Sequence, residues 1–289
     1  MPTPTVNFQY KRNIRSAAPR KLSRISDGDT PVIEQPIRMV SCDTPEKAGY
    51  AGKPETSQPK LDRCRERLEG NFYIELPLQL REYLINKLTG DAAQRHIDAG
   101  NEASHVFDTI LEERLTRPDG KKRNVATIPT GEIIDKYGRL LAYIAPWFSN
   151  TRGDPLPLRD SPERRTFNLN MVENGWAAFF PIYPSLPGNE DMNLAIKAAE
   201  SAWNGQIGIW AGYGRNVLLA YEFRACIKLG TSENGADGIK SAFERICVDL
   251  RDLRIVGKFG FHKVPPCYRV WVWEKDIADA KKDLSLINT

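Results

Sequence analysis

The sequence lacks long apolar runs and is poor in the residues that form disulfides and metal clusters. Its 289 residues include 5 cysteines and 3 histidines. No two cysteines have the Cys-x-x-Cys spacing, which argues for a reducing compartment and against a structural zinc site. His96, His105 and His262 have no ligand-pair spacing, so we interpret them as surface or internally hydrogen-bonded residues.

Three further absences bear on the location and the architecture of the protein. No stretch approaches the roughly 20 apolar residues of a membrane-spanning helix. No apolar segment of a secretory signal follows the basic N-terminal residues, so we expect a cytoplasmic protein without membrane contact. No internal repeat recurs at the periods that mark solenoid proteins. At 289 residues, the chain can form one large domain or two modest ones.

Charge is nearly balanced over the whole chain but not at its N-terminus. The net charge of +4 neither demands nor excludes a polyanionic partner. Residues 1–20 are predicted to be an arm, and only basic charges precede the first acidic residue, Asp27. These are Lys11, Arg12, Arg15, Arg20, Lys21 and Arg24. We interpret the arm as solvated chain, with an electrostatic contact to a nucleic-acid backbone as the functional alternative.

Acidic residues follow two neighbouring predicted strands near the N-terminus. Asp29 comes after the first strand, whereas Asp43 and Glu46 come after a strand predicted at 37–42 that carries Arg38. Carboxylate oxygens are the ligands that Ca2+ and Mg2+ take in proteins. A planar guanidinium binds phosphate oxygens through two parallel hydrogen bonds. This pattern therefore indicates a site for a hard cation and a phosphate at one end of a sheet.

Three polar blocks follow one another along the chain, namely Asp27-Gly-Asp-Thr, then Arg38 with Asp43-Thr-Pro-Glu46, then Asp135-Lys-Tyr-Gly-Arg139. In these blocks and their order, the chain resembles the staphylococcal nuclease (thermonuclease) family from about Lys21 to Trp210. Each block alone is weak, because Asp-Gly-Asp is usually a turn and Asp-Thr-Pro-Glu is commonly a helix start. Their joint order is far more specific.

The resemblance implies an α+β protein built on a five-stranded OB-fold β-barrel with flanking helices. We expect the nuclease-like domain at residues 21–210, after the arm at 1–20. The long interval between Glu46 and Arg139 implies a helical and loop insertion at about 47–100. The residue pattern predicts loop at 47–77 with one short helix near 61–68, and a helix from 92 to 116. Residues 211–289 are predicted to be a small accessory module of α/β or α+β type.

The resemblance also implies an activity, which is Ca2+-dependent hydrolysis of phosphodiester bonds in DNA and RNA. Mg2+ and Mn2+ suit the same carboxylates but are not favoured by the resemblance. Glu46 would be the general base or would position the attacking water. The expected residues are catalytic Arg38, Glu46 and Arg139, substrate-binding Lys136, Tyr137 and Tyr183, and metal-binding Asp29, Asp43 and Thr44.

Two alternatives remain open beside a sugar-non-specific nuclease. The same barrel could serve as a non-catalytic scaffold that binds nucleic acid or assembles other proteins. The carboxylates and arginines argue against a non-catalytic scaffold, because scaffold-only relatives typically lose them.

The expected partner is DNA or RNA, with single strands preferred. An oligomer could form through the insertion or the C-terminal module.

Overall fold

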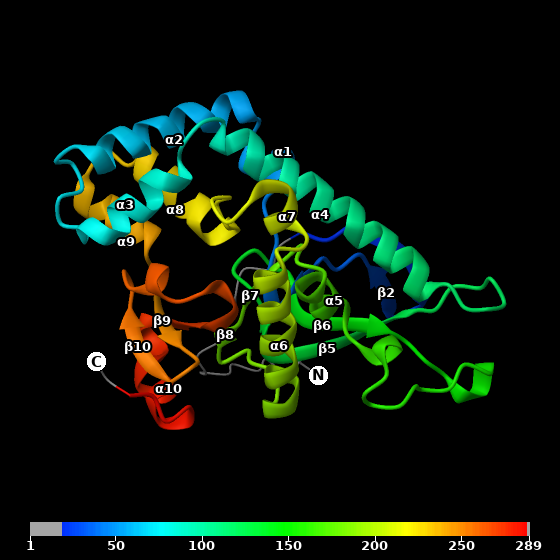
Figure 1. Ribbon diagram of the computed structural model, residues 1–289. Coiled ribbons are helices and arrows are strands. Elements are labelled where there is room, and N and C mark those ends of the chain that lie inside the picture. Colours follow the sequence, from blue (N-terminus) through cyan, green and yellow to red (C-terminus); the bar gives the residue numbers. More distant parts are fainter. Residues whose placement is uncertain (1–18, 288–289) are drawn as a thin grey trace, which may run out of the picture.

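This α+β protein combines a group of helices with several small sheets, and its computed structural model describes residues 19–287 apart from the side chains of Tyr50 and Glu132. Figure 1 shows α2, α3, α8 and α9 gathered at one end, while α4 runs from this group toward the long β5–β6 hairpin. No helix of the described residues is long and apolar enough to cross a membrane. The helices are α1 (Ala48–Ala51), α2 (Pro54–Glu69), α3 (Leu78–Lys87), α4 (Ala92–Leu115), α5 (Phe167–Glu173), α6 (Asn189–Gly205), α7 (Ile209–Tyr213), α8 (Ala220–Thr231), α9 (Gly235–Ala242) and α10 (Ile277–Asp283).

The strands form several open sheets, with the orders β1-β2, β3-β6-β5, β4-β7 and β10-β9-β11-β8. They are β1 (Leu22–Asp27), β2 (Thr30–Ile33), β3 (Ile37–Met39), β4 (Ser41–Asp43), β5 (Val125–Ile134), β6 (Leu140–Pro146), β7 (Ala178–Phe180), β8 (Ile182–Tyr183), β9 (Arg245–Asp249), β10 (Arg254–Gly257) and β11 (Arg269–Trp273).

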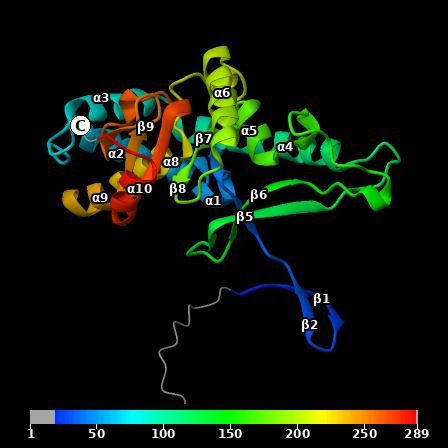
Figure 2. The same ribbon diagram turned by 90° about the horizontal axis from the view of Figure 1, so that it is seen from below.

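The closed five-stranded barrel that we predicted is not confirmed, because the sheets of the described residues remain open. One cause lies at Ser41, whose φ of 57° is left-handed and interrupts the predicted strand at 37–42. Its first half pairs with β6 and its second half with β7, so two small sheets replace one. The β1–β2 hairpin pairs with neither sheet and projects away from the body of the molecule (Figure 2).

The main core joins segments that the sequence analysis assigned to different parts of the chain. In the predicted insertion, α2 and α3 contribute Leu61, Leu68 and Leu84, and residues after 211 contribute Phe223 and Trp271. All five side chains are buried in one cluster. The predicted insertion and the predicted accessory module therefore pack as one body, and the domain boundaries themselves stay predictions.

Two insertion helices had different outcomes. The helix predicted from 92 to 116 is confirmed as α4 (Ala92–Leu115). Residues 47–77 were predicted to be loop with one short helix near 61–68, whereas α2 spans Pro54–Glu69. Pro54 suits the first turn of α2, where the missing N–H is not needed. Leu61, Cys64 and Leu68 then follow helical spacing and are all buried.

Candidate active site

Asp43 lies at the end of β4, where pairing with β7 holds its backbone. Its carboxylate receives hydrogen bonds from two arginines that approach from different elements. Arg38 Nη2 donates to Oδ1 at 2.6 Å, and Arg224 Nη2 of α8 donates to Oδ2 at 2.7 Å. The Asp43 side chain is 2% exposed, whereas each arginine side chain is 31% exposed. One buried carboxylate thus connects two guanidinium groups that both reach the surface.

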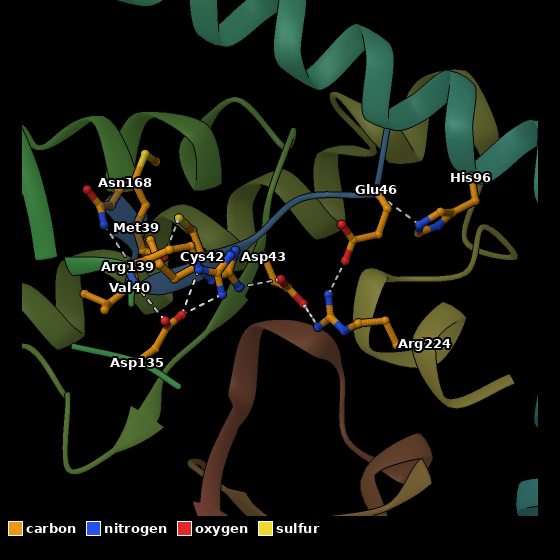
Figure 3. A network of polar contacts seen from close by, with 11 residues as sticks. Met39, Val40, Cys42, Asp43, Glu46, His96, Asp135, Arg139, Asn168 and Arg224 are labelled. Carbon is orange, nitrogen blue, oxygen red and sulfur yellow. Dashed lines mark hydrogen bonds and ion pairs between the residues drawn. The ribbon is translucent and has the colours of Figure 1, made fainter. Parts of the chain in front are cut away.

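Glu46 is held at its side chain and at its backbone by different helices (Figure 3). Its Oε1 accepts a hydrogen bond from Nη1 of Arg224. Its backbone N–H donates to Nε2 of His96 at 2.9 Å, and Nδ1 of the same ring lies 2.8 Å from the carbonyl oxygen of Leu218. Because an N–H can only donate and a carbonyl can only accept, His96 is the neutral tautomer with its proton on Nδ1. The ring stacks on Phe223 with centroids 3.9 Å apart.

The pKa values of the two carboxyl groups shift in opposite directions. Burial alone would raise the pKa of Asp43, but Arg224 and Arg38 outweigh it and lower this pKa to about 2. Burial raises the pKa of Glu46, and the opposing effect of Arg224 does not fully compensate. The difference arises because Asp43 accepts hydrogen bonds from two guanidinium groups, while Glu46 accepts one and also faces the charge of Asp43.

Arg139 directly precedes β6, the strand that pairs with the strand of Arg38. Arg38 is the register partner of Leu141 in the parallel pair β3–β6, and Arg139 stands two positions before Leu141. Its Nη2 lies 2.7 Å from Oδ2 of Asp135, and its guanidinium carbon lies 5.3 Å from the ring centre of Tyr137. The two predicted phosphate-binding arginines are therefore carried by β3 and by the turn that enters its partner strand β6.

The substrate-binding residues predicted from the resemblance lie in two separate places. Lys136 and Tyr137 occupy the exposed β5–β6 turn, with Nζ of Lys136 at 5.3 Å from the ring centre of Tyr137. Tyr183 instead lies on β8 beside β11, and its hydroxyl donates to Asp283 at 2.5 Å. The structure thus joins Tyr183 to the C-terminal helix, and its contact with a nucleotide stays a prediction.

The predicted metal ligands are not gathered around one point. Asp29 lies in the exposed turn of the β1–β2 hairpin, where its carboxylate accepts a hydrogen bond from Thr30 at 3.0 Å. Thr44 directly follows Asp43, but both oxygens of Asp43 already bind arginines. Within residues 19–287, no group of three or more His, Cys, Asp or Glu side chains could hold a metal ion. In this geometry, the residues do not fit a Ca2+ site, and their metal-binding role stays a prediction.

Comparison with known families agrees with the order of the polar blocks. A profile described as staphylococcal nuclease homologue matches residues 36–212, which is more than half of the 289 residues. The chain belongs to the staphylococcal nuclease homologue family. A comparison with curated proteins returned no match.

The matched staphylococcal nuclease segment does not contain the whole site. Arg38, Asp43, Glu46 and Arg139 fall inside residues 36–212. Asp29 lies before this segment, and Arg224 lies after it. The residue that binds both Asp43 and Glu46 therefore comes from a part of the chain that the family match does not cover.

Sequence reasoning missed Arg224 and the positioning role of His96. Arg224 stands in α8 between the buried residues Phe223 and Ala225, and no motif marks it. His96 is 50 residues from Glu46 along the chain, and we interpreted it only as a surface or hydrogen-bonded residue. Both contacts depend on the packing of α4 and α8, which no local sequence pattern specifies.

The arrangement is suited to binding phosphate groups. Arginines bind phosphate oxygens through paired hydrogen bonds, and Arg38 and Arg139 each keep about a third of the side chain exposed. Membership of the staphylococcal nuclease homologue family indicates a nuclease-like or nucleic-acid-binding role. The chemistry of the site and the family agree on a nucleic acid as the partner.

Proposed function

We propose that this protein is a nuclease that hydrolyses phosphodiester bonds of DNA and RNA without sugar specificity. The observation that supports it best is the placement of Arg38 on β3 and of Arg139 directly before the paired strand β6, with β3 leading on to Asp43 and Glu46. Hydrolysis builds negative charge on the phosphate oxygens, and preorganised arginines stabilise that charge in the transition state. A carboxylate nearby can orient a water molecule and accept its proton.

Each residue then has one task in this proposal. Arg38 and Arg139 hold the non-bridging oxygens of the scissile phosphate. Glu46 orients the attacking water through Oε2, which accepts no hydrogen bond from the described residues, and takes up its proton. Lys136 and Tyr137, exposed on the β5–β6 turn, contact the neighbouring nucleotide of a single strand.

A Ca2+ requirement enters the proposal from the resemblance alone. The ion would supply positive charge close to the phosphate, as divalent cations do in phosphoryl chemistry. No step above relies on it, because Asp29 and Asp43 do not meet in this geometry. Mg2+ or Mn2+ would be the alternatives that the carboxylates also suit.

A second candidate is a nucleic-acid-binding protein without turnover. Arg224 supports this candidate, because it binds both Asp43 and Glu46 and so occupies the two carboxylates that catalysis would use. In that case the arginines still bind phosphate groups, but no base activates water. Binding and cleavage must therefore be measured separately.

The deciding experiment combines cleavage and binding with labelled single-stranded DNA and RNA oligonucleotides. The full chain is assayed with Ca2+, with Mg2+ and with a chelator, beside Glu46→Gln and the control Glu233→Gln, whose side chain is exposed outside the site. We expect Glu46→Gln to lower turnover by about 100-fold or more while binding is retained. Equal turnover in Glu46→Gln would remove Glu46 from the mechanism. Binding without any cleavage by the unmodified chain would establish the second candidate.

A further inference from the structure

Arg224 provides a positive charge where a cation-binding site was expected. Its guanidinium bridges Asp43 Oδ2 and Glu46 Oε1, and Arg38 binds the remaining oxygen of Asp43. Two carboxylates and two guanidinium groups cancel in formal charge. The site therefore lacks the excess negative charge that draws a divalent cation out of water.

A cation and Arg224 would also need the same oxygen atoms. Ca2+ binds carboxylate oxygens at about 2.3–2.6 Å and usually takes six or more oxygen ligands. Arg224 Nη2 stands 2.7 Å from Oδ2 of Asp43, so its hydrogen bond uses the lone pairs that the ion would use. The two cannot occupy this position together.

The backbone that carries Arg224 is firmly placed. Its helix α8 buries Phe223, Cys226 and Leu229 in the main core. At Gly230 the helix approaches α2 so closely that a Cβ atom would overlap the carbonyl group of Lys60. Arg224 itself keeps 31% of its side chain exposed, so its guanidinium can turn toward solvent while the helix stays in place.

We propose that Arg224 competes with a divalent cation for Asp43 and Glu46, so that α8 sets the cation affinity of this site. The inference rests on the proposed function in one respect, which is that Asp43 and Glu46 belong to the reaction site. A phosphate group is the ligand that can accept the displaced guanidinium. Cation and polyanion should therefore assist each other in binding, although the competition itself needs no polyanion.

The test measures Ca2+ binding and needs no turnover. Ca2+ affinity of the full chain is measured by equilibrium dialysis, together with Arg224→Gln and the control Arg251→Gln, whose arginine pairs with Asp249 outside the site. We expect Arg224→Gln to bind Ca2+ at least tenfold more tightly than the unmodified chain and to gain thermal stability when Ca2+ is added. Arg251→Gln should match the unmodified chain.

A second variant covers the case in which Arg224→Gln does not fold. Arg224→Lys keeps the charge, but a single ammonium lacks the fork that bridges two carboxylates, so we expect a few-fold gain in Ca2+ affinity. No gain in any folded variant at this position would overturn the inference. This failure is distinct from failure of the proposed function, which would appear as absence of cleavage by the unmodified chain.

Discussion

Asp43 and Glu46 are separated by only two residues, yet their surroundings differ strongly. Asp43 is almost fully buried between two arginines, and its pKa falls to about 2. Glu46 keeps 15% of its side chain exposed and has a raised pKa, with burial as the largest cause. At neutral pH, Asp43 thus serves as a fixed anion that positions arginines. Glu46 has the more adaptable environment of the two.

His96 gives a prediction for the pH dependence of stability. Burial lowers its pKa to about 4 from the ordinary 6.5, so the unfolded chain binds more protons between these two values. The free energy of unfolding should therefore fall as the pH falls through this window, by roughly 3 kcal/mol at most for this residue. The raised pKa of Glu46 acts with the opposite sign.

Urea unfolding between pH 4.5 and 7 measures this effect in the unmodified chain, in His96→Gln and in the control His105→Gln. His105 is exposed on α4 and should leave the pH dependence unchanged. His96→Gln should flatten it, because no buried imidazole remains to resist protonation. If the free energy of unfolding has the same slope against pH in all three proteins, His96 is not protected from protonation in the folded state.

The residues found from the sequence are those that local motifs contain. Arg38, Asp43 and Glu46 stand within nine residues of each other, so the chain itself keeps them close. Arg139 was predicted from the third polar block, whereas the pairing of β3 with β6, which brings its turn to the strand of Arg38, was not predicted. Arg224 could not be found in this way, since 178 positions separate it from Glu46 and only tertiary packing joins them.

At the level of elements, α4 touches the site through a glycine. A Cβ atom at Gly100 would lie 2.6 Å from the carbonyl carbon of Glu46 and 2.9 Å from the carbonyl oxygen of Pro45. Only a residue without a side chain lets the helix approach the motif loop so closely. His96, one turn earlier on the same helix, then reaches the backbone of Glu46.

Gly100→Ala should therefore push the motif loop away from α4. We expect a loss of about 1–3 kcal/mol in the free energy of unfolding, as for other overpacked positions, together with a loss of cleavage. The control is Gly212→Ala on α7, where an added Cβ meets nothing within 4 Å. Both effects are measured by urea unfolding and by the oligonucleotide assay. An unchanged Gly100→Ala protein would mean that the loop yields without cost.

The sequence predicted the helix α4 but not the open sheets. The buried spacing of α4 is local and could be read directly, whereas barrel closure depends on how separate strands pair. The φ of 57° at Ser41 and the outward position of the β1–β2 hairpin have no marker in the residue pattern. The expected barrel therefore came from the resemblance, and the open sheets come from pairings that the pattern did not specify.

On the scale of the whole molecule, the shared core predicts that the nuclease-like segment needs the C-terminal residues. A chain that ends at residue 213 would lack Phe223, Leu229 and Trp271 and would expose Leu61 and Leu84 to water. We expect it to lose cooperative unfolding in urea, since its largest hydrophobic cluster would be incomplete.

The control for this truncation is a chain that begins at residue 36. It lacks the β1–β2 hairpin, whose strand β1 is exposed at every residue, and should still unfold cooperatively. A stable, cooperative chain of residues 1–213 would contradict the prediction and would support an independent module at 211–289, as the sequence analysis expected.

The residues that hold Glu46 and His96 in place follow the family segment in the chain; they are Arg224, Leu218 and Phe223. The ribosome therefore synthesises them after the motif that contains Glu46. Translation at about 5–20 residues per second separates the two events by many seconds. During that interval, Glu46 has neither its arginine nor a partner for the imidazole that holds its backbone. A nascent chain therefore cannot complete this site until most of the protein has been synthesised.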